Sequence, residues 1–207
     1  MQHTHRVSTT RLEAFSDGVI AVAATLLVLE LVVPVPGPHH DGTLVHRLLE
    51  DWPDYAAYVI SFATVGIVWI NHHAMISRLR QTDHTILVLN LLLLMTIGFL
   101  PFATKLMATY VRQPHGQATA AFVYAGAFLL MAVAFGALNR HILVAKTHLL
   151  TTPLDEPARR QVLLRSLSGI APYAIAAPLA FVSPYITLGI CGAIALYYGS
   201  PLASSSS

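Results

Sequence analysis

Charged residues and cysteines are both scarce in this sequence. Asp, Glu, Lys and Arg make up 11% of its 207 residues, against about 25% in an average soluble domain, which argues against a soluble protein. The single cysteine, Cys191, excludes a disulfide framework and argues against a cysteine-based zinc site. The net charge of +2 is too small to indicate nucleic acid as a partner. Residues 1–9 lack the apolar core of a cleavable signal peptide, so we expect the first helix to stay in the protein.

Apolar sequence is abundant instead, with 55% of the residues hydrophobic. About 20 helical residues cross a bilayer core, and six apolar stretches approach this length. We therefore predict an all-α, multi-pass membrane protein with six transmembrane helices per protomer and the lipid bilayer as a partner. The chain should form a single domain over residues 1–207, with its helices within 10–200 and the Ser-rich C-terminal tail outside them. The six stretches are 12–34, 54–76, 84–108, 117–139, 164–182 and 185–200.

Two connections stand out between these stretches. The fifth and sixth are short and meet at Ser183 and Pro184, which predicts a hairpin of two tilted helices. Residues 43–50 carry several leucines after a Pro- and Gly-rich segment and are predicted to form a short interfacial helix. No second copy of the first stretch occurs in the chain.

Basic residues are distributed unevenly over the predicted loops. Lys and Arg collect on the cytoplasmic side of membrane proteins, so nine against three predicts that both termini are cytoplasmic. The nine are Arg6, Arg11, Arg78, Arg80, Arg140, Lys146, Arg159, Arg160 and Arg165, and the three are Arg47, Lys105 and Arg112. The outer side also gathers acidic residues, which either concentrate cations at a pore mouth or are ordinary solvated charges: Glu30, Asp41, Glu50, Asp51 and Asp54.

The first apolar stretch contains polar residues that a lipid-facing helix does not need. Ser16, Asp17 and Thr25 lie inside it and Glu30 lies towards its end, before Pro34. A charge at the centre of a membrane helix costs about 2.5–3.5 kcal/mol. This helix is therefore expected to face a polar interior or a pore.

Helical spacing places several aliphatic residues of this stretch on one stripe. Positions i, i+4, i+7 and i+11 share one side of a helix, which here gives Val22, Leu26, Leu29 and Val33, with Thr25 beside them. Because the stretch is apolar all round, periodicity alone does not show which side faces a pore.

Four motifs together resemble a known family. They are R-x-x-x-F-S-D at 11–17, T-L-L-V-L-E at 25–30, W-x-N-H-H at 69–73, and N-x-x-L-L followed by F-L-P-F at 90–102. The sequence resembles the prokaryotic branch of the transmembrane protein 175 family over roughly residues 10–200. The resemblance implies a potassium-selective channel of the plasma membrane without a pore loop, and leaves proton permeability open. It implies a homotetramer that conducts K⁺ and has no cofactor.

The resemblance also assigns roles along the first helix. It implies that this helix lines the conduction path, that Val22, Leu26 and Leu29 form a hydrophobic constriction, and that Thr25 acts in selectivity. Such a constriction can gate by dewetting. The family usually has isoleucine or leucine where this chain has Val22, so the tightest ring is either wider here or displaced to Leu26.

A polar network near the cytoplasmic ends of the first three helices is also implied. By motif position it would use Arg11, Ser16, Asp17, one histidine of the pair His72 and His73, and Asn90. We expect this network to hold the first helix in place, with direct ion coordination by Asp17 as the alternative.

Two other functions stay open at this stage. A proton-coupled secondary transporter is the first, although no inverted repeat supports it. A membrane-embedded enzyme is the second, with His72 and His73 as its best feature. Adjacent helical histidines point about 100° apart, so one ion rarely binds both. His84 could be a third ligand, but no Glu or Asp follows the pair at i+3 or i+4. We therefore expect no metal site and no enzyme.

Overall fold

The computed structural model describes residues 9–33 and 43–200, and they form a helical protein without a β-sheet, confirming the all-α prediction. The long helices are α1 (Thr9–Val28), α3 (Trp52–Ile76), α4 (His84–Tyr110) and α5 (Gln117–Arg140). The shorter ones are α2 (Leu44–Glu50), α6 (Glu156–Ser168), α7 (Ile170–Leu179) and α8 (Pro184–Gly199), with a π-helical turn η1 (His141–Ala145) and a 3₁₀ turn η2 (Thr147–Leu149) after α5.

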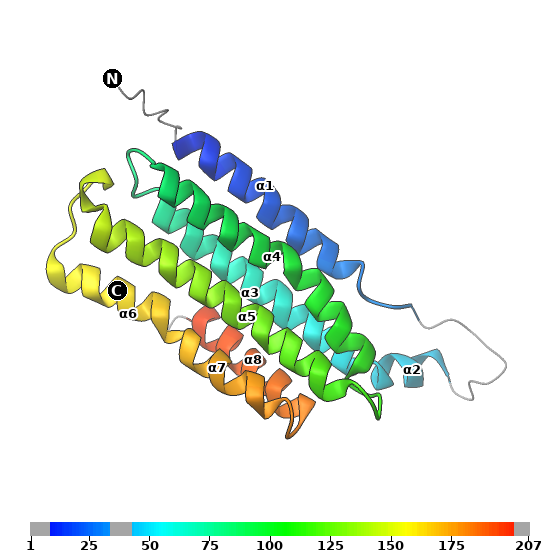
Figure 1. Cartoon of the computed structure of the whole chain (residues 1–207). Helices are drawn as coiled ribbons and strands as arrows, with labels where there is room; N and C mark the ends of the chain where they lie inside the picture. The colour runs from blue at the N-terminus through cyan, green and yellow to red at the C-terminus, as the bar shows by residue number, and fades with distance from the viewer. Residues whose placement is uncertain (1–8, 34–42, 201–207) are drawn as a thin grey trace.

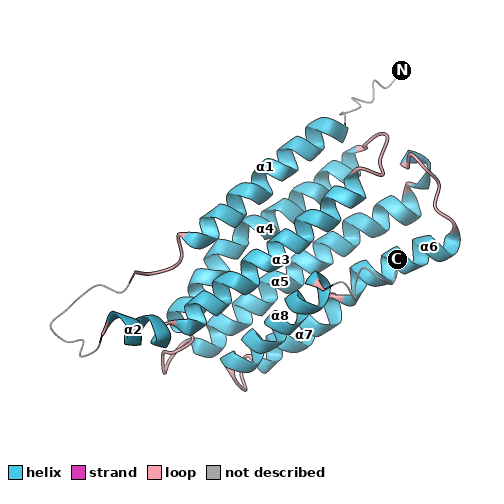
Figure 2. Ribbon diagram, turned by 180° about the vertical axis from the view of Figure 1, so that it is seen from behind, coloured by secondary structure: helices cyan, strands magenta, loops and turns pink. Residues whose placement is uncertain are grey.

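The helices form one elongated bundle with α1 at its edge (Figure 1). α1 packs against α3 and α4, whereas α7 and α8 lie on the far side of the bundle against α5 and α3. α2 stands apart at one end, as Figure 2 also shows. The opposite end, where α1 begins and α3 and α5 end, carries Arg11, Arg78, Arg140 and Lys146, and we call it the basic end.

Four helical segments are long and apolar enough to cross a membrane. They are Trp52–Ile76, His84–Tyr110, Gln117–Ala145 and Glu156–Leu179. α8 is apolar but has only 16 residues. α1 has 20 residues, and Arg11, Glu13 and Asp17 lie within it. Length and composition thus single out four of the six predicted spans.

The fifth span begins earlier than predicted. The sequence indicated 164–182, but α6 already starts at Glu156 and continues through Gly169 into α7. Asp155 accepts a hydrogen bond from the Ala158 N–H at 3.0 Å and so caps the helix. Arg159 and Arg160 lower the hydropathy of the first part of α6. Hydropathy therefore places the start of the fifth span too late in the sequence.

The first helix ends earlier than predicted, and this corrects the position of Val33. After Val28 the N–H groups of Leu29, Glu30 and Leu31 donate to carbonyls three residues back at 3.1–3.2 Å, which is a tightening turn. Pro34 has no N–H for the carbonyl of Glu30 and disfavours helix at Val33. Val33 therefore lies beyond the helix, 77% exposed, and does not continue a helical stripe.

Polar contacts tie the bundle together at defined levels. Deep inside, the Ser61 hydroxyl lies 2.8 Å from that of Thr104 and 3.1 Å from that of Tyr124, which joins α3, α4 and α5. At the basic end, Asp83 caps α4 by accepting from the Ile86 N–H at 2.8 Å. Its carboxylate also lies 3.0 Å from the Lys146 ammonium beyond α5.

The Asp83 carboxyl is more acidic than usual. Burial on its own raises its pKa, but the Ile86 N–H and the Lys146 ammonium outweigh burial and lower the pKa below its ordinary value of 3.8. Asp83 is therefore charged at neutral pH and joins the start of α4 to the end of α5.

Candidate functional site

The two sides of α1 have opposite environments. Leu12, Ser16, Ile20, Ala23 and Leu27 form one stripe that is buried against α3 and α4. Since α1 is apolar all round, its contacts in the folded chain, and not its periodicity, set this division.

The opposite side of α1 is bare in the single chain. Val22 is 57% exposed, Leu26 41% and Leu29 72%, although all three are aliphatic. At about 100° per residue, Thr25 lies at the middle of the uncovered side, Val22 about 60° from it and Leu26 at its flank, while Leu29 follows in the turn after Val28. We call Val22, Thr25, Leu26 and Leu29 the bare face of α1. Contiguous exposed apolar surface of this kind marks a protein or membrane contact.

Thr25 is the polar member of the bare face. Its hydroxyl donates to the Val22 carbonyl at 2.9 Å and is exposed. A hydroxyl that donates in this way still has an oxygen able to accept or to coordinate. The residue is thus satisfied within its own helix and remains accessible.

A chain of hydrogen bonds fixes the buried side of α1 near the basic end. The Asn90 amide donates to the Ser16 hydroxyl at 2.9 Å, and its oxygen lies 2.8 Å from Nε2 of His72. The Ser16 hydroxyl in turn donates to the Leu12 carbonyl at 2.8 Å. Ser16, Asn90 and His72 are fully buried, so this chain links α1, α4 and α3 in the interior.

A second set of polar side chains lies beside this buried hydrogen-bond chain and is partly exposed. The Trp69 indole donates to the Asp17 carboxylate at 2.9 Å, and Nδ1 of His73 lies 2.9 Å from the Glu13 carboxylate. The two adjacent histidines therefore have different partners, as their angular separation requires: His72 reaches Asn90 and His73 reaches Glu13.

Arg11 lies outside both groups in the single chain, and its predicted place in the network stays a prediction. Its side chain is exposed at the start of α1 and makes no ion pair or hydrogen bond with the described part of the chain. Asp17 instead takes its hydrogen bond from Trp69. The physical reason is that Asp17 points to α3, whereas Arg11 precedes it by nearly two turns at the open end of the helix.

Glu13 and Trp69 are participants that sequence reasoning missed. Trp69 stands in the W-x-N-H-H motif, and that motif was the available signal. Possible metal-ligand atoms of Glu13, Asp17 and His73 also lie within 4.8 Å of one another. A search for ligand spacing along one helix cannot find this group, because its members come from α1 and α3. Glu13 and Asp17 already have partners within the protein, which explains the arrangement without an ion.

The acidic residues at the α2 end are paired. Lys105 lies 3.0 Å from Glu30, and Arg112 lies 2.6 Å from Asp51 and 3.4 Å from Asp54. Burial alone lowers the pKa of Arg112, but the two carboxylates outweigh burial and raise it. Basic partners thus face Glu30, Asp51 and Asp54, which weakens the idea that these acidic residues concentrate cations at a pore mouth. Asp41 lies outside the described residues.

A family, a bacterial sequence relative and a solved structure that match this chain are all described as potassium channels. The family described as endosomal/lysosomal potassium channel TMEM175 matches residues 11–101. A potassium channel of Streptomyces collinus is 44% identical over 190 residues, which cover 91% of this chain and 90% of that protein. The crystal structure of a lysosomal potassium-selective channel TMEM175 homologue from Chamaesiphon minutus matches with a TM-score of 0.82 at 38% identity, covering 96% of this chain and 97% of that one.

A vertebrate relative matches over a shorter range. The endosomal/lysosomal proton channel TMEM175 of Mus musculus is 41% identical over 117 residues, which are 54% of this chain and 23% of that protein. The similarity to the bacterial proteins therefore extends over the whole bundle, whereas the family match ends within α4.

Proposed function

Since the chain belongs to the TMEM175 family, whose members are ion channels and not enzymes, we propose that it is a potassium-selective channel of the cell membrane. K⁺ is its permeant ion, and no cofactor takes part. Six helices per protomer cross the bilayer in one channel domain within residues 10–200, with both termini in the cytoplasm. Proton permeation is a further property, which the change of internal pH in the liposomes of the flux test below measures.

The observation that carries this proposal is the bare face of α1. A single chain covers one side of α1 completely and leaves the side with Val22, Leu26 and Leu29 open. One chain contains one such helix, so several chains are needed to surround a path. We propose a homotetramer in which four copies of α1 face a common axis.

In this assembly the bare face supplies the gate. Aliphatic side chains of four copies at one level exclude water when the ring is narrow, so a cation loses its hydration there without replacement. Val22 and Leu26 are one turn apart and form two stacked rings, followed by Leu29 at the end of the helix. Thr25 offers its accessible hydroxyl oxygen at this level and contributes to selectivity.

The polar groups near the basic end act as a scaffold in this proposal. The hydrogen bonds from Asn90 to Ser16 and His72 hold α1 at a fixed depth and rotation. The bond from Trp69 to Asp17 adds a contact nearer the surface. The carboxylates of Asp17 and Glu13 both contact side chains of α3 in the same chain. This favours a role in holding α1 in place over a role in ion coordination.

Flux through reconstituted protein tests the proposal. Wild-type protein in liposomes should pass K⁺ faster than Na⁺, in unitary currents and without saturable coupling to protons. Leu26→Asn should wet the ring, raise the basal flux and reduce the preference for K⁺. Leu196→Asn is the matched control, because Leu196 is 77% exposed on α8, away from α1.

Two results would count against the proposal. Equal effects of Leu26→Asn and Leu196→Asn would mean that α1 does not line the path. Saturable, proton-coupled exchange in place of unitary currents would identify a secondary transporter.

A further inference from the structure

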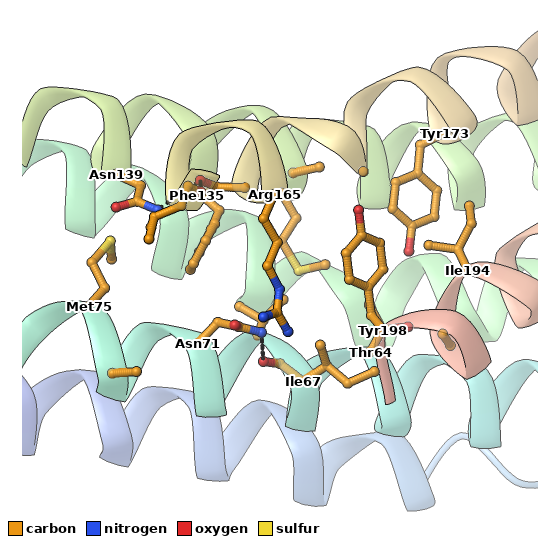
Figure 3. A pocket seen from close by; sticks show the side chains of 18 of the residues that line it. Thr64, Ile67, Asn71, Met75, Phe135, Asn139, Arg165, Tyr173, Ile194 and Tyr198 are labelled. Carbon is orange, nitrogen blue, oxygen red and sulfur yellow. Dashed lines mark hydrogen bonds between the residues drawn. The ribbon is translucent and has the colours of Figure 1, made fainter. Parts of the chain in front are cut away.

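A cavity of about 210 Å³ lies on the side of α3 away from α1 (Figure 3). Helices α3, α5, α6, α7 and α8 surround it. Most of its lining is apolar, and polar side chains lie at both of its ends. The apolar wall includes Val68, Met131, Phe135 and Ile194. The polar side chains are Asn71, Asn139, Arg165 and Ser166 towards the basic end, and Thr64, Tyr173 and Tyr198 towards the other.

Arg165 gives the cavity its charge. Figure 3 shows its side chain reaching from α6 across the cavity towards Asn71 on α3. Arg165 is partly buried, and no ion pair among the described residues includes it. By contrast, Lys105, Arg112 and Lys146 each have an acidic partner. A charge inside a membrane segment ordinarily has a partner or water, so Arg165 has capacity for an anion.

The neighbouring polar groups do not supply that anion. Asn71 donates its amide to the Ile67 carbonyl at 2.7 Å, and Asn139 donates to the Ser166 hydroxyl at 2.8 Å. The described lining contains no Asp or Glu, and its second basic residue, Arg78, is exposed at the basic end. The cavity thus combines the guanidinium groups of Arg165 and Arg78 with a largely apolar wall.

We propose that this cavity binds an anionic phospholipid. The phosphate pairs with Arg165, with Arg78 nearby, because guanidinium groups bind phosphate through charge-assisted hydrogen bonds. One acyl chain lies along the apolar wall towards Met131 and Ile194. Basic pockets between transmembrane helices on the cytoplasmic side suit such head groups. A free phosphate ion would leave the apolar wall unused.

The test measures lipid binding and does not depend on ion conduction. Purified full-length protein in detergent is titrated with phosphatidylglycerol or with phosphatidylcholine of the same acyl chains, and bound lipid is counted by native mass spectrometry. Inorganic phosphate serves as the competitor. The variants are Arg165→Gln, Ala132→Phe, which fills the apolar part of the cavity, and the matched control Arg160→Gln, which removes an exposed arginine of α6 outside the cavity.

Wild-type protein should bind phosphatidylglycerol at least about tenfold more tightly than phosphatidylcholine, as expected for a hydrogen-bonded charge pair. Arg165→Gln should abolish this preference, Ala132→Phe should weaken phosphatidylglycerol binding, and Arg160→Gln should retain both.

Equal losses in Arg165→Gln and Arg160→Gln would overturn the proposal in favour of general surface attraction. Inorganic phosphate could displace phosphatidylglycerol while Ala132→Phe binds this lipid like the wild type. That result would overturn the proposal, because the cavity would then bind the phosphate group alone and not an acyl chain. If Arg165→Gln yields no folded protein, Ala132→Phe decides alone, and wild-type affinity of that variant for phosphatidylglycerol refutes the proposal.

Discussion

Replacing Asn90 by alanine should loosen α1 more than any other single change in the buried hydrogen-bond chain. Asn90 bonds to Ser16 on α1 and to His72 on α3, and all three side chains are fully buried. Nδ1 of His72 has no partner in the described structure. The variant Asn90→Ala therefore leaves the imidazole with no hydrogen bond at all.

The magnitude follows from the number of bonds lost. A buried hydrogen bond contributes about 1 kcal/mol net, and within membranes the average is lower, about 0.6 kcal/mol. Asn90→Ala removes two bonds and should cost about 1–2 kcal/mol. Ser16→Ala removes one of them and should cost about half as much. Because Ser16 reaches the rest of the chain through Asn90, the double variant should cost little more than Asn90→Ala alone.

Unfolding of the purified protein by increasing fractions of a denaturing detergent, followed by circular dichroism, measures these free energies. Thr96→Ala is the control on the same helix, since the Thr96 hydroxyl bonds only to the Leu93 carbonyl of α4; it should cost less than about 0.5 kcal/mol. Additive costs of Ser16→Ala and Asn90→Ala, or costs no larger than that of Thr96→Ala, would show that this chain of bonds does not hold α1.

Three further predictions concern other parts of the molecule. Asp17→Ala removes the partner of the Trp69 indole at a partly exposed site, so it should cost about 1 kcal/mol in detergent unfolding and leave ion preference unchanged; altered K⁺/Na⁺ flux would make Asp17 a coordinating group. Val22→Phe should narrow the proposed ring and suppress K⁺ flux without changing the elution volume of the assembly, and wild-type flux would contradict the ring. Asp83→Asn keeps the cap of α4 but loses the charge that faces Lys146. Because the pKa of Asp83 is lowered by folding, its contribution is present at neutral pH and is lost on acidification below 3.8. The melting temperature of this variant should thus lie below that of the wild type at pH 7 and approach it in acid, and a constant difference would refute the linkage.

The sequence predicted the helices better than their contacts. Composition and apolar stretches predicted an all-α membrane protein, and Thr43 to Glu50 does contain the short helix α2, whose cap is Thr43. The start of α6 was missed because Arg159 and Arg160 lower its hydropathy, although they lie in a helix that continues into an apolar span.

Contacts between distant residues were beyond local sequence patterns. Periodicity could not divide α1 into a packed and a bare side, because both sides are apolar. The partners of Asp17 and Glu13 are Trp69 and His73, and only the packing of α1 on α3 brings them together. The resemblance placed Arg11 and Asp17 in one network by motif position, and within the single chain Asp17 bonds to Trp69.

The bare face of α1 also determines what can hold copies of this chain together. Lipid chains are as apolar as Val22 and Leu29, so replacing lipid by a second copy gains little from the hydrophobic effect. Thr25 already bonds within its own helix and needs no partner from another chain. Association in a bilayer is then governed by close packing and by the mole fraction of protein in lipid. The amount of an assembly of several chains varies as a power of the protein-to-lipid ratio. When reconstituted protein is diluted with more lipid, the K⁺ flux per protein molecule should therefore fall.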